Sequence, residues 1–452
     1  MSRLDSFEAV HFIGGGGVSM SALAKLMLSR GKKVTCSDVS YSKYLEELGE
    51  KGVHVYLGSD VEVVLSGDLT RKLVVYNAAI PETDAELAAA QNALIPCIPR
   101  AHFLSEVARD YKYTACVSGT HGKTTATGMA AYIFKAAGAE FTAHIGGSVV
   151  GIGNLYTGGS LLFLTEACEY KRSFLALSPD YAVILNAEED HPDTYKEQDE
   201  VYAAFDEFVQ KVPIRANVIV NSDTEYGKRV VGATRFAIRD ETAGFVATEL
   251  KEYRNGYYSF NITEQGNYAC EVKLKVPCFH NIYNALAAYA LCRRSGVSVE
   301  NCVKGLDAFP GVERRFERKG TAGQAEVYID YAHHPTEIEA TIRSAMQLKP
   351  KKLIVVFQPH TFSRTKALFD EFVCAFSEPD SVFIFKEYAA RETPVDGLSA
   401  RDLYESLSSL RSKVNYYDNA VNLAARLIAE GKDGGIVLIL GAGDIDTLAD
   451  LL

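Results

Sequence analysis

The stretch Gly119-Thr120-His121-Gly122-Lys123-Thr124-Thr125 stands between an apolar run and a helical pattern. Residues 113–118 (YTACVS) are strand formers. Residues 124–137 place apolar side chains at helical spacing, and Gly138 stands where a helix usually ends. A glycine loop between a strand and a helix N-terminus brings backbone amides and partial positive charge to phosphate oxygens. The stretch therefore predicts a phosphate-binding loop in an α/β domain.

Two side chains of this loop have predicted roles of their own. Lys123 supplies a full positive charge, and Thr124 is placed to ligate a magnesium ion. The spacing departs from G-x-x-x-x-G-K-[ST], because Val117 occupies the first glycine position. A glycine turn with no ligand is the plain alternative, but the lysine and two threonines favour a nucleotide. The predicted nucleotide-binding residues of the loop are Gly119, Thr120, Gly122, Lys123, Thr124 and Thr125.

Length and composition set outer limits on fold and function. The chain has 452 residues, which suits three domains at roughly 150 residues each. A net charge of −11 disfavours nonspecific binding to nucleic acid or an anionic membrane. No run of about 18 apolar residues and no signal-peptide pattern is present, so we expect a cytoplasmic protein without membrane insertion. Nine scattered cysteines without C-x-x-C pairs indicate reduced thiols.

A second glycine-rich loop follows the first predicted strand, residues 10–13. Gly14, Gly16 and Gly17 meet most of the G-x-G-x-x-G dinucleotide pattern, but Ser19 occupies the third glycine position. The next predicted strand, residues 33–37, ends at Asp38, where a ribose-binding acid would lie in a nicotinamide enzyme. By itself this pattern fits NAD, another nucleotide diphosphate, or a tight turn that binds nothing.

The middle of the chain places acidic and imidazole side chains after predicted strands. Glu166 follows the apolar run 161–165, and His191 lies in an acidic turn after the run 181–186. Ligands of open α/β sheets bind at such strand ends. A lone histidine is usually structural, yet His191 in this turn could hold a second metal ion, and both interpretations stay open. Residues 233–276 predict a peripheral sheet, and an alanine-rich helix begins at 280.

A composition shift near Pro310-Gly311 marks the last predicted domain, in which strands again alternate with helical patterns. Its strands end in three polar loops, at residues 330–335, 358–364 and 441–444. Apolar strands that repeatedly end in His, Arg and Asp are hard to explain by packing alone. We therefore predict that the three loops form one site.

Nine ordered motifs together resemble the Mur ligase family. They are HFIGGGGVSMSALA, SGTHGKTT, TEACEYKRSFL, NAEEDHPDTY, HNIYNALAA, GVERRFE, DYAHHPTE, FQPHTFSRT and GAGDI. The resemblance implies an α/β protein of three domains: a Rossmann-like UDP-sugar-binding domain (1–109), a central P-loop ATPase domain with a mainly parallel sheet (110–309), and a Rossmann-like domain for the amino acid (310–452). It favours a UDP diphosphate over NAD at the first glycine loop.

The resemblance also implies a reaction, cofactors and partners. L-alanine would be joined to the lactyl carboxylate of UDP-N-acetylmuramate through an acyl phosphate, with ATP and Mg²⁺ as cofactors, in peptidoglycan synthesis. A ligase adding another amino acid or a recycled peptide, and a nicotinamide-dependent oxidoreductase, remain alternatives. No nucleic acid is expected, and the chain would be a monomer or homodimer.

Roles for single residues follow from the resemblance alone. Lys123, His191, His333 and Arg364 would be catalytic. Thr124, Glu166 and His191 would hold magnesium. The remaining ATP contacts would be His280, Asn281, Asn284, Arg315 and Asp330. The substrates would contact Gly14, Gly16, Gly17, Ser37, Asp38, Tyr331, His333 and Arg364.

Five positions depart from the family pattern. Ser19 replaces a glycine, Asn77-Ala78 replaces serines, and Cys168 replaces an aspartate. Thr361 stands where an arginine is common. These departures concern sugar-nucleotide and amino-acid contacts more than the ATP site, so they bear on substrate preference more than on reaction type.

Overall fold

The structure is a computed structural model that describes residues 3–189, 194–389, 392 and 399–452. It divides into two compact units. One comprises Met1–Lys251, Ser259–Lys275 and His280–Pro310; the other comprises Glu252–Tyr258, Val276–Phe279 and Gly311–Leu452. Each unit is described by itself below.

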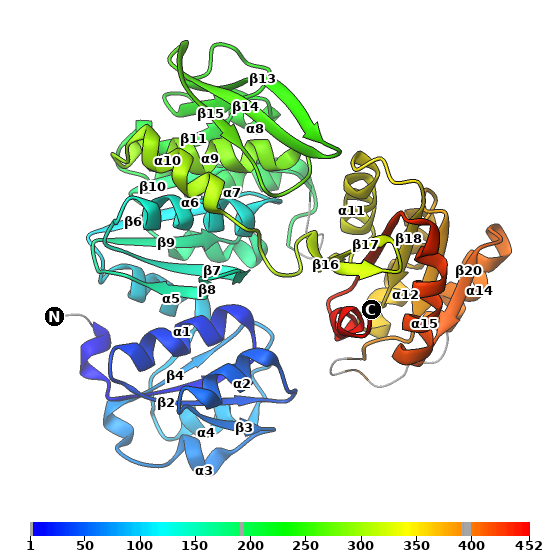
Figure 1. Ribbon diagram of the computed structural model, residues 1–452. Coiled ribbons are helices and arrows are strands. Elements are labelled where there is room, and N and C mark those ends of the chain that lie inside the picture. Colours follow the sequence, from blue (N-terminus) through cyan, green and yellow to red (C-terminus); the bar gives the residue numbers. More distant parts are fainter. Residues whose placement is uncertain (1–2, 190–193, 390–391, 393–398) are drawn as a thin grey trace. The chain divides into compact units, whose positions relative to one another are not determined.

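The first sheet of the first unit is five-stranded and parallel, in the order β3-β2-β1-β4-β5 (Figure 1). Chain order reverses on either side of β1, which places the ligand crevice at its carboxyl end. The strands are β1 Ala9–Ile13, β2 Lys33–Asp38, β3 His54–Leu57, β4 Lys72–Tyr76 and β5 Cys97–Pro99. The helices are α1 Val18–Ser29, α2 Lys43–Glu50, α3 Val61–Val64, α4 Ala85–Asn92 and α5 Arg100–Ala108.

The second sheet has ten strands in the order β15-β14-β13-β12-β11-β10-β6-β9-β7-β8. Its strands are β6 Tyr113–Ser118, β7 Phe141–Val149, β8 Gly153–Thr157, β9 Leu162–Ala167, β10 Tyr181–Ile184, β11 Val218–Asn221, β12 Thr234–Ala237, β13 Phe245–Arg254, β14 Tyr257–Glu264 and β15 Asn267–Lys273. Strand β6 lies between β10 and β9, all three parallel, so the loop after β6 opens at the middle of the sheet. The predicted peripheral sheet at 233–276 was wrong in one respect, because β12 to β15 continue this sheet at its edge.

Helices α6 Lys123–Ala136, α9 His280–Arg294 and α10 Val299–Ala308 pack against one another. The other helices around this sheet are α7 Gln198–Gln210 and α8 Glu225–Arg229. A continuous apolar cluster joins the first sheet to the second, and it includes Phe12 of β1, Phe103 of α5 and Phe163 of β9. Helix α1 also packs on β7 and β8. Burial of this shared surface stabilises the arrangement of the two sheets within the first unit.

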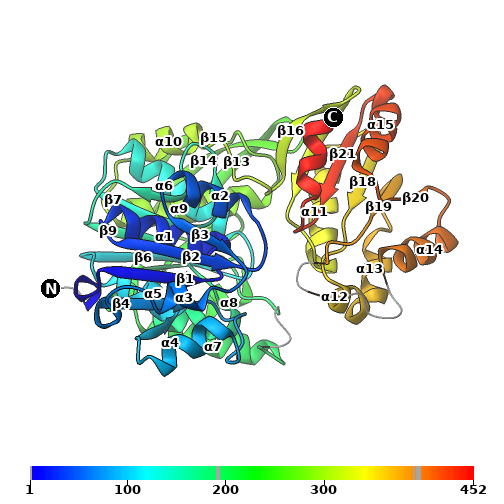
Figure 2. The same ribbon diagram turned by 90° about the horizontal axis from the view of Figure 1, so that it is seen from below.

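The sheet of the second unit has six strands in the order β16-β17-β21-β18-β19-β20. The strands are β16 Glu317–Ala322, β17 Ala325–Asp330, β18 Leu353–Phe357, β19 Ser381–Phe385, β20 Val414–Tyr417 and β21 Ile436–Leu440. The helices are α11 Pro335–Gln347, α12 Phe362–Ala367, α13 Phe369–Ala375, α14 Ala400–Leu410 and α15 Ala420–Glu430. Apolar side chains of α11, α13 and α14 pack in the core on one face, and those of α15 pack in the core on the other. Figure 2 shows these helices around the sheet. Only β16 runs antiparallel among the described strands of this sheet.

The predicted fold class, an α/β protein with three domains and mainly parallel sheets, is confirmed by these three sheets. In the part of the chain that the structure describes, no helix is both long and apolar enough to cross a membrane.

Candidate active site

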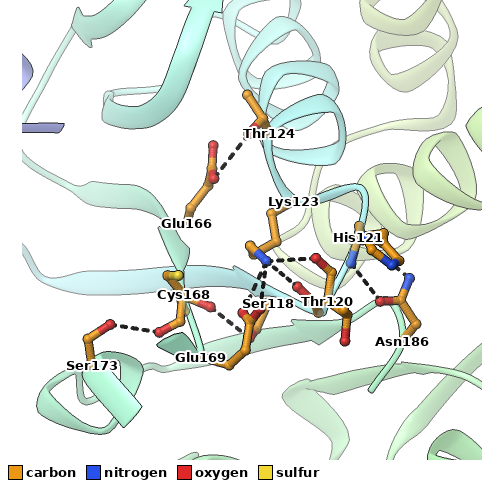
Figure 3. Close-up of polar contacts among 12 residues, drawn as sticks. Ser118, Thr120, His121, Lys123, Thr124, Glu166, Cys168, Glu169, Ser173 and Asn186 are labelled. Carbon is orange, nitrogen blue, oxygen red and sulfur yellow. Dashed lines mark hydrogen bonds and ion pairs between the residues drawn. The ribbon is translucent and has the colours of Figure 1, made fainter. Parts of the chain in front are cut away.

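The phosphate loop joins β6 to α6 at two glycines with positive φ, +142° at Gly119 and +86° at Gly122 (Figure 3). A Cβ on Gly122 would lie 2.4 Å from Asn284 Oδ1, so only glycine lets α9 approach the loop this closely. Gly122 is also the N-cap of α6, and no side chain caps that helix end. The first backbone amides of α6 are therefore available to an anion.

The end of β10 holds the loop in shape. The His121 amide donates to Asn186 Oδ1 at 2.8 Å, and Asn186 Nδ2 donates back to the His121 carbonyl at 3.2 Å. One step further, the Glu188 amide donates to Thr120 Oγ1 at 2.9 Å. The sequence analysis did not single out Asn186. Its position directly after a strand that pairs with β6 was the signal that could have found it.

Lys123 turns back into the loop and meets a carboxylate that the sequence analysis also missed. Its Nζ donates to the carbonyls of Gly119 at 2.5 Å and Thr120 at 3.0 Å, and lies 3.0 and 3.1 Å from the two Glu169 oxygens (Figure 3). Burial lowers the pKa of Lys123, but Glu169 more than compensates, so the pKa is raised and the ammonium stays charged. Glu169 therefore pairs with the positive charge of Lys123, with which a bound phosphate would otherwise pair.

Thr124 and Glu166, two of the predicted magnesium residues, come together. Thr124 Oγ1 lies 3.2 Å from Glu166 Oε2, and the Gly146 amide donates to Glu166 Oε1 at 2.6 Å. A hydroxyl and a carboxylate are hard oxygen ligands that suit Mg²⁺. The predicted strand end at 165 was two residues short, because β9 runs to Ala167 and Glu166 lies within it. His191, the third predicted ligand, lies outside the described residues, which contain no group of three metal-ligating His, Cys, Asp or Glu side chains.

The residues predicted to contact adenine lie at the start of α9. His280 begins the helix, and Asn284 Nδ2 donates to Asn281 Oδ1 at 2.9 Å. Burial lowers the pKa of His280 to about 4, so its imidazole is neutral and has one nitrogen to donate and one to accept. Because Gly122 is in contact with Asn284, these side chains adjoin the phosphate loop.

The first glycine loop is built around Asp38. The Gly16 amide donates to Asp38 Oδ2 at 3.0 Å, and a Cβ on Gly16 would lie 2.9 Å from the same oxygen. Gly17 is the N-cap of α1 and no side chain caps it, so the helix amides face an open end. Ser37 is only 1% exposed and its hydroxyl donates to Glu86 Oε2, which leaves no surface for a ligand.

In the second unit, three loops meet at the carboxyl ends of β17, β18 and β21. Arg314 Nη2 donates to the carbonyls of Gly441 at 2.6 Å and Gly443 at 2.9 Å. Gln358 Nε2 donates to Asp444 Oδ1 at 2.8 Å. Arg314, in the segment before β16, and Gln358, directly after β18, therefore both hold the loop that follows β21.

Asp330 is a buried carboxylate at the end of β17. It accepts from the amides of Phe316 at 2.7 Å and Ala332 at 2.8 Å. Burial raises the pKa of Asp330, while Arg315 and these amides oppose the rise. Its oxygens thus hold the 314–316 turn on the sheet, and the contact with the ribose stays a prediction.

The predicted amino-acid residues form one cluster with an additional histidine. The rings of Tyr331 and His333 are 5.3 Å apart, those of His333 and His360 are 5.9 Å apart, and Arg364 Nη1 lies 3.3 Å from His360 Nδ1. The guanidiniums of Arg314 and Arg315 lie 4.9 and 5.6 Å from the Tyr331 ring centroid. Burial lowers the pKa of His333. Burial, together with the neighbouring His333, Arg364 and Arg314, lowers the pKa of His360 to about 4. The positive charge of the cluster therefore comes from its arginines, and the histidines are neutral. A cluster of arginines suits a carboxylate ligand.

Family comparisons cover nearly all of this framework. The description "Mur ligase family, catalytic domain" matches residues 9–112, "Mur ligase middle domain" matches 117–292, and "Mur ligase, glutamate ligase domain" matches 314–443. The chain belongs to the Mur ligase family. The three matches follow the three sheets in order, so the phosphate loop lies in the middle domain of a Mur ligase and the Tyr331 cluster in its C-terminal domain.

Similar proteins extend the match to full length. The UDP-N-acetylmuramate–L-alanine ligase of Acetivibrio thermocellus is 37% identical, with 100% of this chain and 97% of the relative covered. The enzyme of the same name from Lachnospira eligens is 39% identical, with 96% of each covered. Among solved structures, the UDP-N-acetylmuramate-alanine ligase of Thermotoga maritima superposes with a TM-score of 0.82 at 26% identity, with 98% of this chain and 97% of that chain covered. A murein peptide ligase from Psychrobacter arcticus, at 23% identity and a TM-score of 0.72 over 98% of each chain, shares the fold.

Proposed function

We propose that this Mur ligase joins L-alanine to the lactyl carboxylate of UDP-N-acetylmuramate, with hydrolysis of ATP to ADP and phosphate, in peptidoglycan synthesis. The observation that carries the proposal is full-length identity of 37–39% to ligases of that name, on a chain that keeps a formed phosphate loop and a cationic acceptor cluster. The oxidoreductase alternative has no support, because a Mur ligase family assignment covers the first glycine loop.

The division of labour follows the predicted domains. Residues 1–109 bind the sugar nucleotide, with the uncapped α1 amides after Gly17 taking the diphosphate. Residues 110–309 bind ATP, and residues 310–452 bind the amino acid. ATP and the sugar nucleotide are cytoplasmic metabolites, so we place the protein in the cytoplasm.

Phosphoryl transfer in such a site depends on positioning and neutralised charge. When ATP binds, its terminal phosphates replace Glu169 as the ionic partner of Lys123. The amides of Gly122 and of the first turn of α6 donate to the remaining phosphate oxygens. Thr124 and Glu166, with His191 as a third proposed ligand, would hold Mg²⁺, which supplies further neutralisation of phosphate charge. The lactyl carboxylate then attacks the terminal phosphorus, giving an acyl phosphate and ADP.

The second step joins the amine to the activated acyl group. Arg364 pairs with the alanine carboxylate, and Tyr331 and His333 form the wall beside it. With its carboxylate fixed, the amine is aimed at the acyl carbon, and collapse of the tetrahedral intermediate releases phosphate and leaves the amide. Neutral His333 has a nitrogen to accept a proton from the attacking amine.

The test is phosphate release with all three substrates present. L-alanine, glycine, L-serine and the tripeptide L-alanyl-γ-D-glutamyl-meso-diaminopimelate are each supplied with ATP and UDP-N-acetylmuramate. The proposal expects L-alanine to give the highest kcat/KM by at least about tenfold, as one methyl group in a fitted pocket distinguishes substrates. Preference for the tripeptide would instead assign the chain to the recycling ligases, and release without the sugar nucleotide would exclude both.

A further inference from the structure

A chain of hydrogen bonds runs from Arg100, at the start of α5, to the strand that carries Glu166. Arg100 Nη1 donates to Ser19 Oγ at 3.2 Å, and Ser19 Oγ lies 2.9 Å from His144 Nε2. The other ring nitrogen, His144 Nδ1, lies 3.0 Å from Thr165 Oγ1, which donates to the Glu166 carbonyl at 3.1 Å. This relay therefore links the helix of the first glycine loop to the predicted magnesium ligand.

The two ends of the relay fix the direction in which it donates. A guanidinium only donates, so Ser19 Oγ accepts from Arg100 and has its own hydrogen to donate to His144 Nε2, which also lies 3.4 Å from the Ser19 carbonyl. Because the Thr165 hydroxyl donates to a carbonyl, Thr165 Oγ1 accepts from His144 Nδ1. This direction requires a neutral imidazole, and burial with the nearby Arg100 charge lowers the pKa of His144 to about 4.

The relay engages Arg100 Nη1, and the described residues supply no hydrogen-bond acceptor for the other guanidinium donors. Among the residues that the structure describes, no carboxylate lies within 4.0 Å of Arg100. The side chain is half-buried, and burial lowers its pKa with only the Cys168 thiol opposing. A partly desolvated guanidinium without a counterion is costly, which indicates an anionic ligand at this point.

Arg100 also lies where the two substrates of the first chemical step must meet. On one side it contacts Ser19, in the first turn of α1 behind the glycine loop. On the other side, the relay through His144 and Thr165 reaches the strand that carries Glu166. In the proposed reaction, UDP-N-acetylmuramate must extend from the glycine loop towards the magnesium site. Arg100 lies between these two places.

We propose that Arg100 binds the lactyl carboxylate of UDP-N-acetylmuramate, the group that receives the phosphoryl, and that Ser19 and His144 orient its guanidinium for that contact. The inference rests on the proposed function. It also gives a use to Ser19, because a glycine at that position would have no hydroxyl to hold Arg100. The diphosphate of the same substrate is the other anion within the domain, and the uncapped amides of α1 already serve it.

Calorimetric titration of three ligands separates the two anions. UDP-N-acetylmuramate carries the lactyl carboxylate, UDP-N-acetylglucosamine lacks it, and UDP retains only the diphosphate. Arg100→Met should weaken UDP-N-acetylmuramate binding by about 10- to 100-fold, the usual range for a hydrogen bond to a charged group, and change the other two by less than about twofold. Arg109→Met, on the last turn of the same helix, is the matched control and should change none of them.

Each contrary outcome has a distinct meaning. Equal weakening of all three ligands would assign Arg100 to the diphosphate, and unchanged binding of all three would remove it from the site; either result overturns the inference while leaving the function intact. Failure of the wild-type protein to bind UDP-N-acetylmuramate would overturn the proposed function itself.

Ser19→Ala tests the orienting part of the proposal with a milder change that is expected to fold. It should weaken UDP-N-acetylmuramate by about 2- to 10-fold, as for one neutral hydrogen bond, and leave UDP-N-acetylglucosamine unchanged. The thermal midpoint of each variant is measured beside the titrations. Loss of stability without this ligand-specific difference would show that Ser19 only joins the two sheets.

Discussion

Lys123 and Glu169 form a buried ion pair inside the phosphate loop, with side chains 16% and 2% exposed and an N–O distance of 3.0 Å. The pair satisfies the charge of the ammonium, whose Nζ also donates to the carbonyls of Gly119 and Thr120. ATP must then replace one anion by another around the same nitrogen, which costs less than desolvating a free lysine.

Lys123→Met should lower kcat for ligation by at least about 100-fold, because the variant loses one donor to the charge that develops on the transferred phosphoryl group. Binding of UDP-N-acetylmuramate should survive. Steady-state phosphate release and calorimetry measure the two quantities. Lys135→Met removes an exposed lysine from the far end of the same helix and should keep wild-type turnover. Near wild-type turnover in Lys123→Met would refute the assignment of this loop to ATP.

Glu169→Gln should lower the free energy of unfolding of the ligand-free protein by about 3 kcal/mol, since it leaves a buried ammonium without its counterion. Adding ATP should raise the free energy of unfolding more than in wild type, because in the variant the phosphates neutralise a Lys123 ammonium that has lost its counterion. Urea denaturation with and without ATP measures both. Equal stability of variant and wild type would mean that water, not Glu169, compensates Lys123.

Glu166→Gln should raise the magnesium concentration needed for half-maximal rate, because an amide oxygen is a poorer ligand for a hard cation than a carboxylate. Titration of activity with magnesium at saturating ATP gives that concentration. The control is Glu241→Gln, which makes the same exchange at an exposed residue in a turn. Superimposable titrations for Glu166→Gln and wild type would exclude direct ligation.

The phosphate loop was predictable because its chemistry is local. A strand, two glycines, a lysine and a helix are contiguous in sequence, and the strand and helix were found within one residue of their predicted ends. Glu169 and Asn186 were missed because each acts on the loop from another strand's end. Their identity as partners depends on β9 and β10 flanking β6, and strand order is not written in any one segment.

Buried polar side chains were the other weakness. The substrate contact of Ser37 was predicted from the family resemblance and stays a prediction, although its buried hydroxyl donates to Glu86 Oε2. Successive side chains of a strand point to opposite faces, so an error of one residue in the predicted strand moves a side chain from the ligand crevice to the core. The relay through His144 was invisible for a related reason, since its members come from α1, α5, β7 and β9 and meet only when two sheets pack together.

His144 predicts part of the pH dependence of stability. Its pKa is lowered to about 4 in the folded protein, against about 6.5 when unfolded, so the unfolded chain binds more protons as pH falls. The stabilisation is fully present above pH ~6.5 and is lost as pH falls towards 4, by up to ~3 kcal/mol for this one group.

His144→Gln should therefore flatten the fall in free energy of unfolding between pH 6.5 and 4, although it lowers stability at neutral pH by disturbing the relay. Urea denaturation across that range gives the slope. The control is His54→Gln, an exposed histidine whose loss should leave the slope as in wild type. A slope unchanged in His144→Gln would mean that folding does not lower the pKa of His144.

The last prediction concerns Thr361 and Arg364 in the amino-acid cluster. Arg364 Nη1 lies 3.3 Å from His360 Nδ1, and neutral His360 accepts this bond, so one edge of the fork is oriented and the other can pair with a carboxylate. Thr361 has φ +68° and ψ 142°, and its amide donates to the Tyr388 carbonyl at 2.9 Å. The backbone at 361 is held in a strained conformation, so the side chain of an arginine at this position would leave the backbone in the same direction as that of Thr361.

Arg364→Lys keeps the charge but loses the planar fork, so it should raise KM for L-alanine by about tenfold or more and leave KM for ATP nearly unchanged. Thr361→Arg should lower KM for L-alanine by adding a second charge-assisted contact. Initial rates over alanine and ATP concentrations measure both constants, and Arg343→Lys on the exposed side of α11 is the control. If Arg364→Lys weakened ATP and alanine equally, Arg364 would belong to the phosphate site, and the placement of the amino acid against Tyr331 and His333 would be wrong.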